Sequence, residues 1–230
     1  MRDIRKQLGA VWRTASRLDA QAQGGRNLMV VAATQGEGVT TVAANLALIA
    51  SRRADKAVWL VDLDVRRNAV YKSFKQASMQ GMGVPGRAYD ASLREQPPYR
   101  ITPSVVQNED QKLLSVHRIQ GTQLYITRFR NEYLRGGQRV QICSAAKWWR
   151  ALRQIADWTL VDAPALDRSS AALTVASQMD GIIMVVEADR TSAQEVADAR
   201  REIEDHGGTV IGIVMNCVGA DARLVNRFVR

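Results

Sequence analysis

The sequence predicts an α/β fold, in which a doubly wound, mostly parallel β-sheet carries helices on both faces. Two observations support this prediction. Apolar runs of strand length alternate along the chain with helix-periodic segments, which is the order of elements in βαβ units. These runs are continuous rather than alternating with polar residues, as in strands that are buried on both faces. Four of them read VWLVD, WTLVD, GIIMVVE and TVIGIVMN.

The chain begins with a predicted amphipathic helix at residues 2–18, where Ile4, Leu8, Val11, Ala15 and Leu18 form one helical stripe. This helix either lies on an anionic membrane surface or packs on the domain or a neighbouring subunit, and the modest apolar face favours packing. The other expected elements are strand 28–32, helix 38–53, strand 57–62, a helix from 68, strands 124–127 and 140–142, helix 145–157, strand 159–162, helix 170–177, strand 181–187, helix 192–206, strand 209–216 and a short helix from 221.

Glycine and proline punctuate residues 77–122, which we therefore expect to be a loop with short helices. The domain prediction is an N-terminal arm at residues 1–23 and a single domain at residues 24–230 that contains this irregular segment.

The chain has 230 residues and a formal net charge of +9. No apolar run approaches the roughly 20 residues that span a bilayer, and no signal peptide is visible at the N-terminus, so we expect a cytoplasmic protein. Cys143 and Cys217 are expected to be buried, inert thiols. The positive charge indicates either an anionic partner (nucleic acid, lipid or an acidic protein tail) or arginines spread over solvated faces. The absence of any block of five basic residues favours the second interpretation.

A glycine-rich loop of the phosphate-binding type links the strand at 28–32 to the next helix. Its glycines would let backbone N–H groups surround phosphates at a helix N-terminus, and the hydroxyl of Thr40 would bind Mg²⁺. Val39, however, stands where such a loop has the lysine that reaches the β- and γ-phosphates, and Ala33 replaces the first glycine. The predicted nucleotide-binding residues of the loop are Gly36, Glu37, Gly38, Val39, Thr40 and Thr41.

Aspartates end two of the predicted strands, where ligands bind in open α/β sheets. Asp62, Asp64 and Asp162 are the predicted catalytic residues, because a carboxylate there can hold Mg²⁺ or polarise an attacking water. Thr40, Asp62 and Asp162 are the predicted metal ligands. For any one aspartate the alternative role is to cap a turn or a helix.

Three further polar residues complete the predicted nucleotide site. Arg66 and Arg67 follow Asp64 closely and suit phosphate, although solvated surface arginines are the alternative. Asn216 ends the last core strand, where its amide would read a purine edge or cap a turn.

In this order the motifs GEGVTT, VDLDVRR, WTLVDAP, DGIIMVVEADRT and VIGIVMNCV resemble the deviant-Walker ParA/MinD-type ATPases. Within that group they look most like the cytoplasmic domain of bacterial tyrosine kinases (BY-kinases), over residues 24–218. The departures are Val39 for the P-loop lysine, Thr34 for the family's second lysine, and Asn68 for the proline of the second motif. Only Arg13 matches the family's N-terminal oligomerisation motif, and the tyrosine-rich C-terminal tail is missing.

The resemblance implies a P-loop NTPase-like fold, with ATP or ADP and Mg²⁺ as cofactors if nucleotide binding is retained, and no cofactor otherwise. It implies a role in exopolysaccharide or capsule biosynthesis and export, next to the inner membrane through a membrane polysaccharide co-polymerase, with a homo-oligomer as a further expectation. The lost lysine favours a pseudo-kinase or pseudo-ATPase subunit. The first alternative is an active ATPase or tyrosine kinase in which Arg66, Arg67 or a neighbouring subunit's arginine supplies the missing charge. A ParA-like DNA partition ATPase is less favoured, because the basic residues form no visible stripe.

Overall fold

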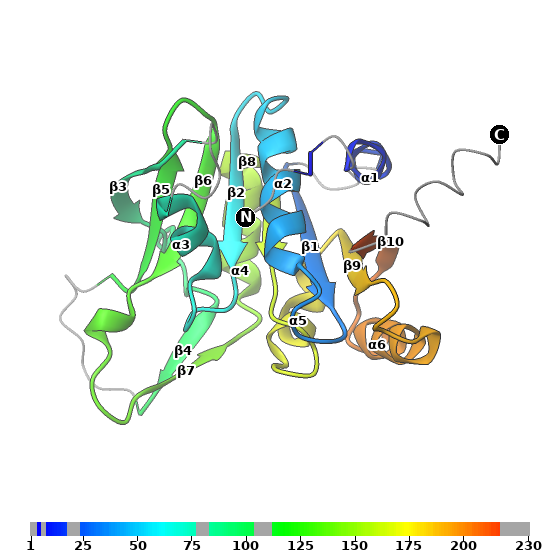
Figure 1. Ribbon diagram of the computed structural model, residues 1–230. Coiled ribbons are helices and arrows are strands. Elements are labelled where there is room, and N and C mark those ends of the chain that lie inside the picture. Colours follow the sequence, from blue (N-terminus) through cyan, green and yellow to red (C-terminus); the bar gives the residue numbers. More distant parts are fainter. Residues whose placement is uncertain (1–3, 6–7, 18–23, 77–82, 104–111, 217–230) are drawn as a thin grey trace.

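An eight-stranded sheet forms the centre of the computed structural model, which describes residues 4–5, 8–17, 24–76, 83–103 and 112–216 (Figure 1). The six strands from β10 to β6 are parallel to one another, and β5 and β3 extend the β6 edge in antiparallel pairing. The prediction of a doubly wound, mostly parallel sheet is therefore confirmed. In spatial order the strands are β10 (Val210–Asn216), β9 (Gly181–Glu187), β1 (Arg26–Ala32), β8 (Ala156–Asp162), β2 (Ala57–Asp62), β6 (Leu124–Phe129), β5 (Leu114–Ile119) and β3 (Pro85–Asp90).

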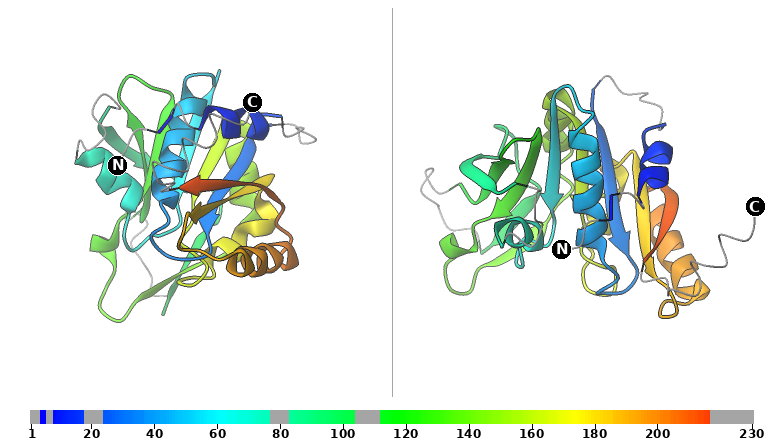
Figure 2. Two further views of the ribbon diagram at one scale, coloured as in Figure 1. Left: turned by 45° about the vertical axis from the view of Figure 1, so that its right-hand side comes forward. Right: turned by 45° about the horizontal axis from the view of Figure 1, so that its top comes forward.

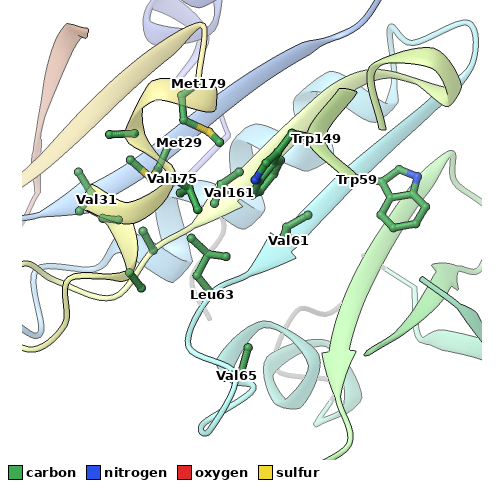
Figure 3. Close-up of a cluster of buried hydrophobic side chains, with 14 of the residues drawn as sticks. Met29, Val31, Trp59, Val61, Leu63, Val65, Trp149, Val161, Val175 and Met179 are labelled. Atoms are coloured by element: carbon green, nitrogen blue, oxygen red, sulfur yellow. The ribbon is translucent and has the colours of Figure 1, made fainter. Parts of the chain in front are cut away.

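Helices contribute to a hydrophobic core on each face of the sheet. Along β1, Leu28 and Val30 belong to one core, whereas Met29 and Val31 belong to the other, which Figure 3 shows in part. This division explains why the strand sequences are continuously apolar. The first core includes residues of α1 (Gly9–Ala15), α2 (Val39–Ser51) and α3 (Ala69–Lys75), and the second includes residues of α4 (Ala146–Ile155), α5 (Ala171–Val175) and α6 (Ala193–Asp205). Two short 3₁₀ helices are η1 (Asn131–Tyr133) and η2 (Ala176–Gln178).

The expectation of a loop with short helices at residues 77–122 is wrong for the described part of that segment. It contains β3, β5 and β4 (Tyr99–Thr102), and β4 pairs with β7 (Arg139–Ile142) in a separate two-stranded sheet. The sequence of β5 looks too polar for a core strand, yet Ser115 and His117 are both buried. They are satisfied there because the Ser115 hydroxyl lies 3.2 Å from His117 Nε2, and His117 Nδ1 lies 2.9 Å from the carbonyl of Gly86.

The N-terminal helix is shorter than predicted in the described part of the chain and packs on the domain. Leu8, Trp12 and Ala15 are buried in the core, and the ring centroids of Trp12 and Trp158 lie 4.8 Å apart. The expectation that this helix packs rather than lies on lipid agrees with this arrangement, in which α1 lies beside α2 (Figures 1 and 2). Within the described residues, no helix is both long and apolar enough to cross a bilayer.

Two further sequence expectations concern the cysteines and the last predicted helix. Cys143 is a free thiol that is half-buried rather than fully buried, and burial raises its pKa. Cys217 and the helix expected from residue 221 lie outside the described residues.

Replacing Trp12 with alanine is expected to lower the free energy of unfolding by about 3 kcal/mol, because it removes a buried indole that contacts both the core and Trp158. Urea unfolding followed by circular dichroism measures the change. Arg13→Ala, at an exposed position on the same helix, serves as the control and should change stability by less than about 0.5 kcal/mol. Equal, small changes in both variants would show that α1 does not pack on the domain in solution.

Candidate functional site

The glycine-rich loop connects β1 to α2 at the edge of the sheet where the parallel strands end. Gly36 and Gly38 have φ angles of 99° and 95°, a region that residues with a Cβ rarely adopt. Gly38 is also the residue before the first turn of α2, and no side chain caps that turn. The helix N-terminus therefore presents its first N–H groups without a side-chain acceptor, as a phosphate-binding loop requires.

Glu37 braces this loop from within the protein. Its side chain is fully buried, and its carboxylate accepts hydrogen bonds from the N–H of Thr34 at 3.2 Å, the N–H of Glu187 at 3.0 Å and the hydroxyl of Thr191. The amide of Asn216 donates to the Glu37 carbonyl at 2.8 Å, and a Cβ on Gly38 would collide with that amide. The structure thus places Glu37 and Asn216 as supports of the loop, and their direct contact with nucleotide stays a prediction.

The three predicted metal ligands lie together. The Thr40 hydroxyl donates to Asp162 Oδ2 at 2.8 Å, and Asp62 faces Asp162 in the register of β2 and β8. The Asp62 carboxylate accepts from the N–H groups of Asp64 at 2.8 Å and Val70 at 3.1 Å, which fixes its orientation.

Burial makes the two facing aspartates costly to ionise. It raises the pKa of Asp62 to about 7, against backbone hydrogen bonds from Val70, Asp64 and Ala69 that lower it. The pKa of Asp162 is also raised, first by burial and then by the charge of Asp62, and the Thr40 hydrogen bond offsets only part of this. A divalent cation would compensate both charges, so the donor set fits Mg²⁺. Within the described residues no group of three His, Cys, Asp or Glu forms a complete metal site, so such an ion would take its other ligands from water and phosphate.

A cleft of about 240 Å³ opens between the glycine-rich loop and the turn that follows β8. It brings together most of the predicted residues, with Arg168 as an addition, and Arg168 Nη2 lies 2.6 Å from Asp64 Oδ2. Arg67 Nε lies 3.8 Å from the same oxygen. Arg66 is exposed and lines a neighbouring hollow instead. The predicted residues that line the cleft are Gly36, Gly38, Val39, Thr40, Thr41, Asp64, Arg67 and Asp162.

The sequence prediction missed two arginines at this site, Arg168 and Arg190. Arg190 donates to Glu187 at 2.8 Å and to the Gln35 carbonyl at 3.2 Å, beside Gly36. Both arginines follow strands that end at this edge, which is the signal that could have identified them. The prediction considered only the basic residues adjacent to Asp64.

Val39 is the first residue of α2, and its half-buried side chain packs against the core that contains α2. The helix position that would carry a lysine therefore contributes apolar packing and no charge to the cleft.

No family model matches the chain. The tyrosine-protein kinase CpsD of Streptococcus agalactiae is 23% identical over 209 residues, which cover 89% of this chain and 81% of that protein. The tyrosine-protein kinase YwqD of Bacillus subtilis is 25% identical over 195 residues, which cover 83% and 72% of the two chains.

Solved structures share the fold. The kinase domain of the Escherichia coli tyrosine kinase ETK matches with a TM-score of 0.59 at 19% identity, covering 90% of this chain and 72% of that domain. The septum site-determining protein MinD of Pyrococcus horikoshii, complexed with Mg-ADP, matches with a TM-score of 0.54 at 17% identity, covering 85% and 71%. These matches confirm the prediction of a P-loop NTPase-like fold.

Proposed function

We propose that this BY-kinase-like P-loop protein is a pseudo-kinase or pseudo-ATPase subunit of exopolysaccharide or capsule biosynthesis and export. One observation carries the proposal: Val39 packs on the core at the position from which a lysine would reach the β- and γ-phosphates. The residues suited to Mg²⁺ are retained beside it, with Thr40 hydrogen-bonded to Asp162 at 2.8 Å. The site therefore keeps the residues that suit the metal and lacks the lysine that would contact the terminal phosphates.

The loss of the lysine charge should reduce the rate of phosphoryl transfer far more than it reduces nucleotide binding. An electrostatic group aimed at the developing charge of a transition state is worth roughly 3–4 kcal/mol, or 10²–10³ in rate. Thr40, Asp62 and Asp162 would hold Mg²⁺, which would neutralise part of the charge of the phosphates when bound. The residues of the loop would position a nucleotide through backbone N–H groups, which need no lysine.

The proposed partner is a membrane polysaccharide co-polymerase, which the protein would regulate from the cytoplasmic side of the inner membrane. This part rests on the resemblance to BY-kinases. Co-purification of the tagged chain with a co-polymerase encoded beside it, unchanged by Thr40→Ala, would support regulation without catalysis. Co-purification with a DNA-bound partner instead would contradict it.

Isothermal titration calorimetry with Mg-ATP tests the state of the nucleotide site. We expect a dissociation constant near the millimolar range, about −4 kcal/mol, because the loop and metal ligands act without the lysine. Thr40→Ala should abolish the Mg²⁺ dependence of this binding, because it removes the hydroxyl that faces Asp162. Thr41→Ala is the matched control for the metal, since it removes a hydroxyl from the same cleft that is not a predicted metal ligand, and it should keep the Mg²⁺ dependence whatever it does to affinity. Submicromolar affinity in the wild-type chain would contradict the proposal.

Arg67 and Arg168 line the cleft and favour a second candidate, an active ATPase or tyrosine kinase with a compensating arginine. If it is correct, Arg168→Gln or Arg67→Gln should reduce Mg²⁺-dependent ATP turnover by about 10²-fold or more. Arg66→Gln is the control, because Arg66 does not line this cleft. We expect these substitutions to remove no turnover, because Asp64 already binds the guanidinium of Arg168 at 2.6 Å and lies 3.8 Å from that of Arg67.

A further inference from the structure

Six arginines line two adjoining hollows at the end of the sheet opposite the cleft. The hollows measure about 660 Å³ and 460 Å³ and share Arg5 and Arg52. The larger hollow lies between α1, the C-terminal end of α2 and the starts of β1 and β8. The smaller one lies between the C-terminal end of α2 and the turn that joins β5 to β6. Figure 1 shows these elements at one end of the sheet. No aspartate or glutamate is among the described residues that line either hollow. We call this surface the arginine trough; its arginines are Arg5, Arg13, Arg26, Arg52, Arg53 and Arg118.

Local structure accounts for three of these arginines. Arg26 donates to the Ser16 carbonyl at 2.9 Å, Arg53 to the Ile49 carbonyl at 3.3 Å, and Arg118 to the Thr122 carbonyl at 2.9 Å. Each of these bonds uses only part of a guanidinium group, which has five N–H donors. The charge of these three arginines is not matched by a carboxylate among the described residues that line the trough.

Arg13 and Arg52 have no such role. Both are exposed, and neither side chain forms a hydrogen bond or ion pair within the described part of the chain. Arg13 lies in the last turn of α1 and Arg52 follows α2 directly, so each charge is favoured by the C-terminal end of a helix, but this uses none of the N–H donors of either guanidinium group. Two arginines outside the trough differ in this respect, since Arg128 and Arg200 each lie 2.7 Å from a glutamate. At this end of the molecule, arginines from separate segments gather around two hollows.

We propose that the arginine trough binds an acidic peptide segment of a partner protein. Guanidinium groups bind carboxylates through paired hydrogen bonds, and a concave surface of this size suits an extended chain. A membrane surface would instead require exposed apolar anchors, yet Trp12 of α1 is buried. Single-stranded nucleic acid would require an open aromatic face for stacking, whereas the guanidinium of Arg26 lies over Trp158, 5.1 Å from its ring centroid.

The trough is independent of the nucleotide site. It lies where the parallel strands begin, whereas the cleft lies where they end. The proposal of peptide binding and the proposal of lost catalysis therefore concern different sites, and either can be wrong without the other.

Fluorescence anisotropy of labelled octaglutamate, with the full chain at low ionic strength, tests the proposal. We expect binding of octaglutamate but not of octaglutamine, and about tenfold weaker binding in the double variant Arg13→Gln/Arg52→Gln. The control Arg200→Gln/Arg201→Gln removes the same charge from exposed positions on α6 and should bind like the wild type. Circular dichroism checks that all variants are folded.

Several results would overturn the proposal. Equal weakening in both double variants would show that only the net charge matters. Failure of the wild type to bind octaglutamate would also overturn the proposal. So would tighter binding of phosphatidylglycerol vesicles or oligo(dT) that depends on Arg13 and Arg52. Self-association that only the Arg13→Gln/Arg52→Gln variant loses, without octaglutamate binding, would assign the trough to a second copy of the chain.

Discussion

Replacing Val39 with lysine is expected to raise Mg²⁺-dependent ATP turnover by about 10²–10³-fold over the wild-type background and to tighten nucleotide binding. The reason is positional, because Val39 is the first residue of α2 and lines the cleft next to Thr40. A lysine there can lay its apolar stem along the core that Val39 now contacts and extend its ammonium group into the cleft. The lost valine packing should cost about 1 kcal/mol of stability.

Single-turnover phosphate release and calorimetry measure this gain. Val39→Met is the matched control, since methionine has a long side chain without charge. If the lysine and methionine variants behave alike, the defect of the loop does not reside in the missing charge at this position. Ala33 or the Asp64-bound arginines would then be the next features to change.

Replacing Asp162 with asparagine is expected to stabilise the protein above neutral pH. The pKa of Asp162 is raised in the folded state by burial and by the nearby charge of Asp62. A raised folded-state pKa means that the stability associated with this group is present below its ordinary pKa of 3.8 and is lost as the pH rises through the folded value. We therefore expect the variant to be more stable than the wild type at about pH 8 and to differ little from it at about pH 4.

Urea denaturation at several pH values measures this difference. Asp189→Asn is the control, because Asp189 is exposed and asparagine tolerates its positive φ of 64°. The Thr40 hydroxyl can still donate to the asparagine oxygen, so the variant separates charge from hydrogen bonding. A loss of stability that does not depend on pH would contradict the prediction, because it would mean that the charges of Asp62 and Asp162 do not lower the free energy of unfolding. If the variant gains stability and loses Mg²⁺-dependent nucleotide binding, the charge of Asp162 that destabilises the folded chain is the same charge that the nucleotide site requires.

The sequence identified those parts of the site that depend on local order. A strand, two glycines and a helix place Thr40 next to the carboxyl end of β8, and the run of apolar residues before Asp162 locates that end. Arg168 was missed because its contact with Asp64 joins residues far apart in the sequence, and its position soon after the end of β8 was the one signal available for it.

The strands at the sheet edge were missed for a different physical reason. Ser115 and His117 satisfy their polar groups through each other and through the distant carbonyl of Gly86, which hydropathy along the chain cannot detect. The arginine trough was missed because its members come from separate segments that meet only in the folded chain, so no block of basic residues marks it.

Mg²⁺-dependent ATP turnover by the purified wild-type chain tests the central claim most directly. The proposed loss of phosphoryl transfer predicts a rate that does not exceed that of Thr40→Ala, whether or not nucleotide binds. A Mg²⁺-dependent rate that Thr40→Ala abolishes and Thr41→Ala retains would contradict it, and would show that the cleft performs chemistry without the lysine.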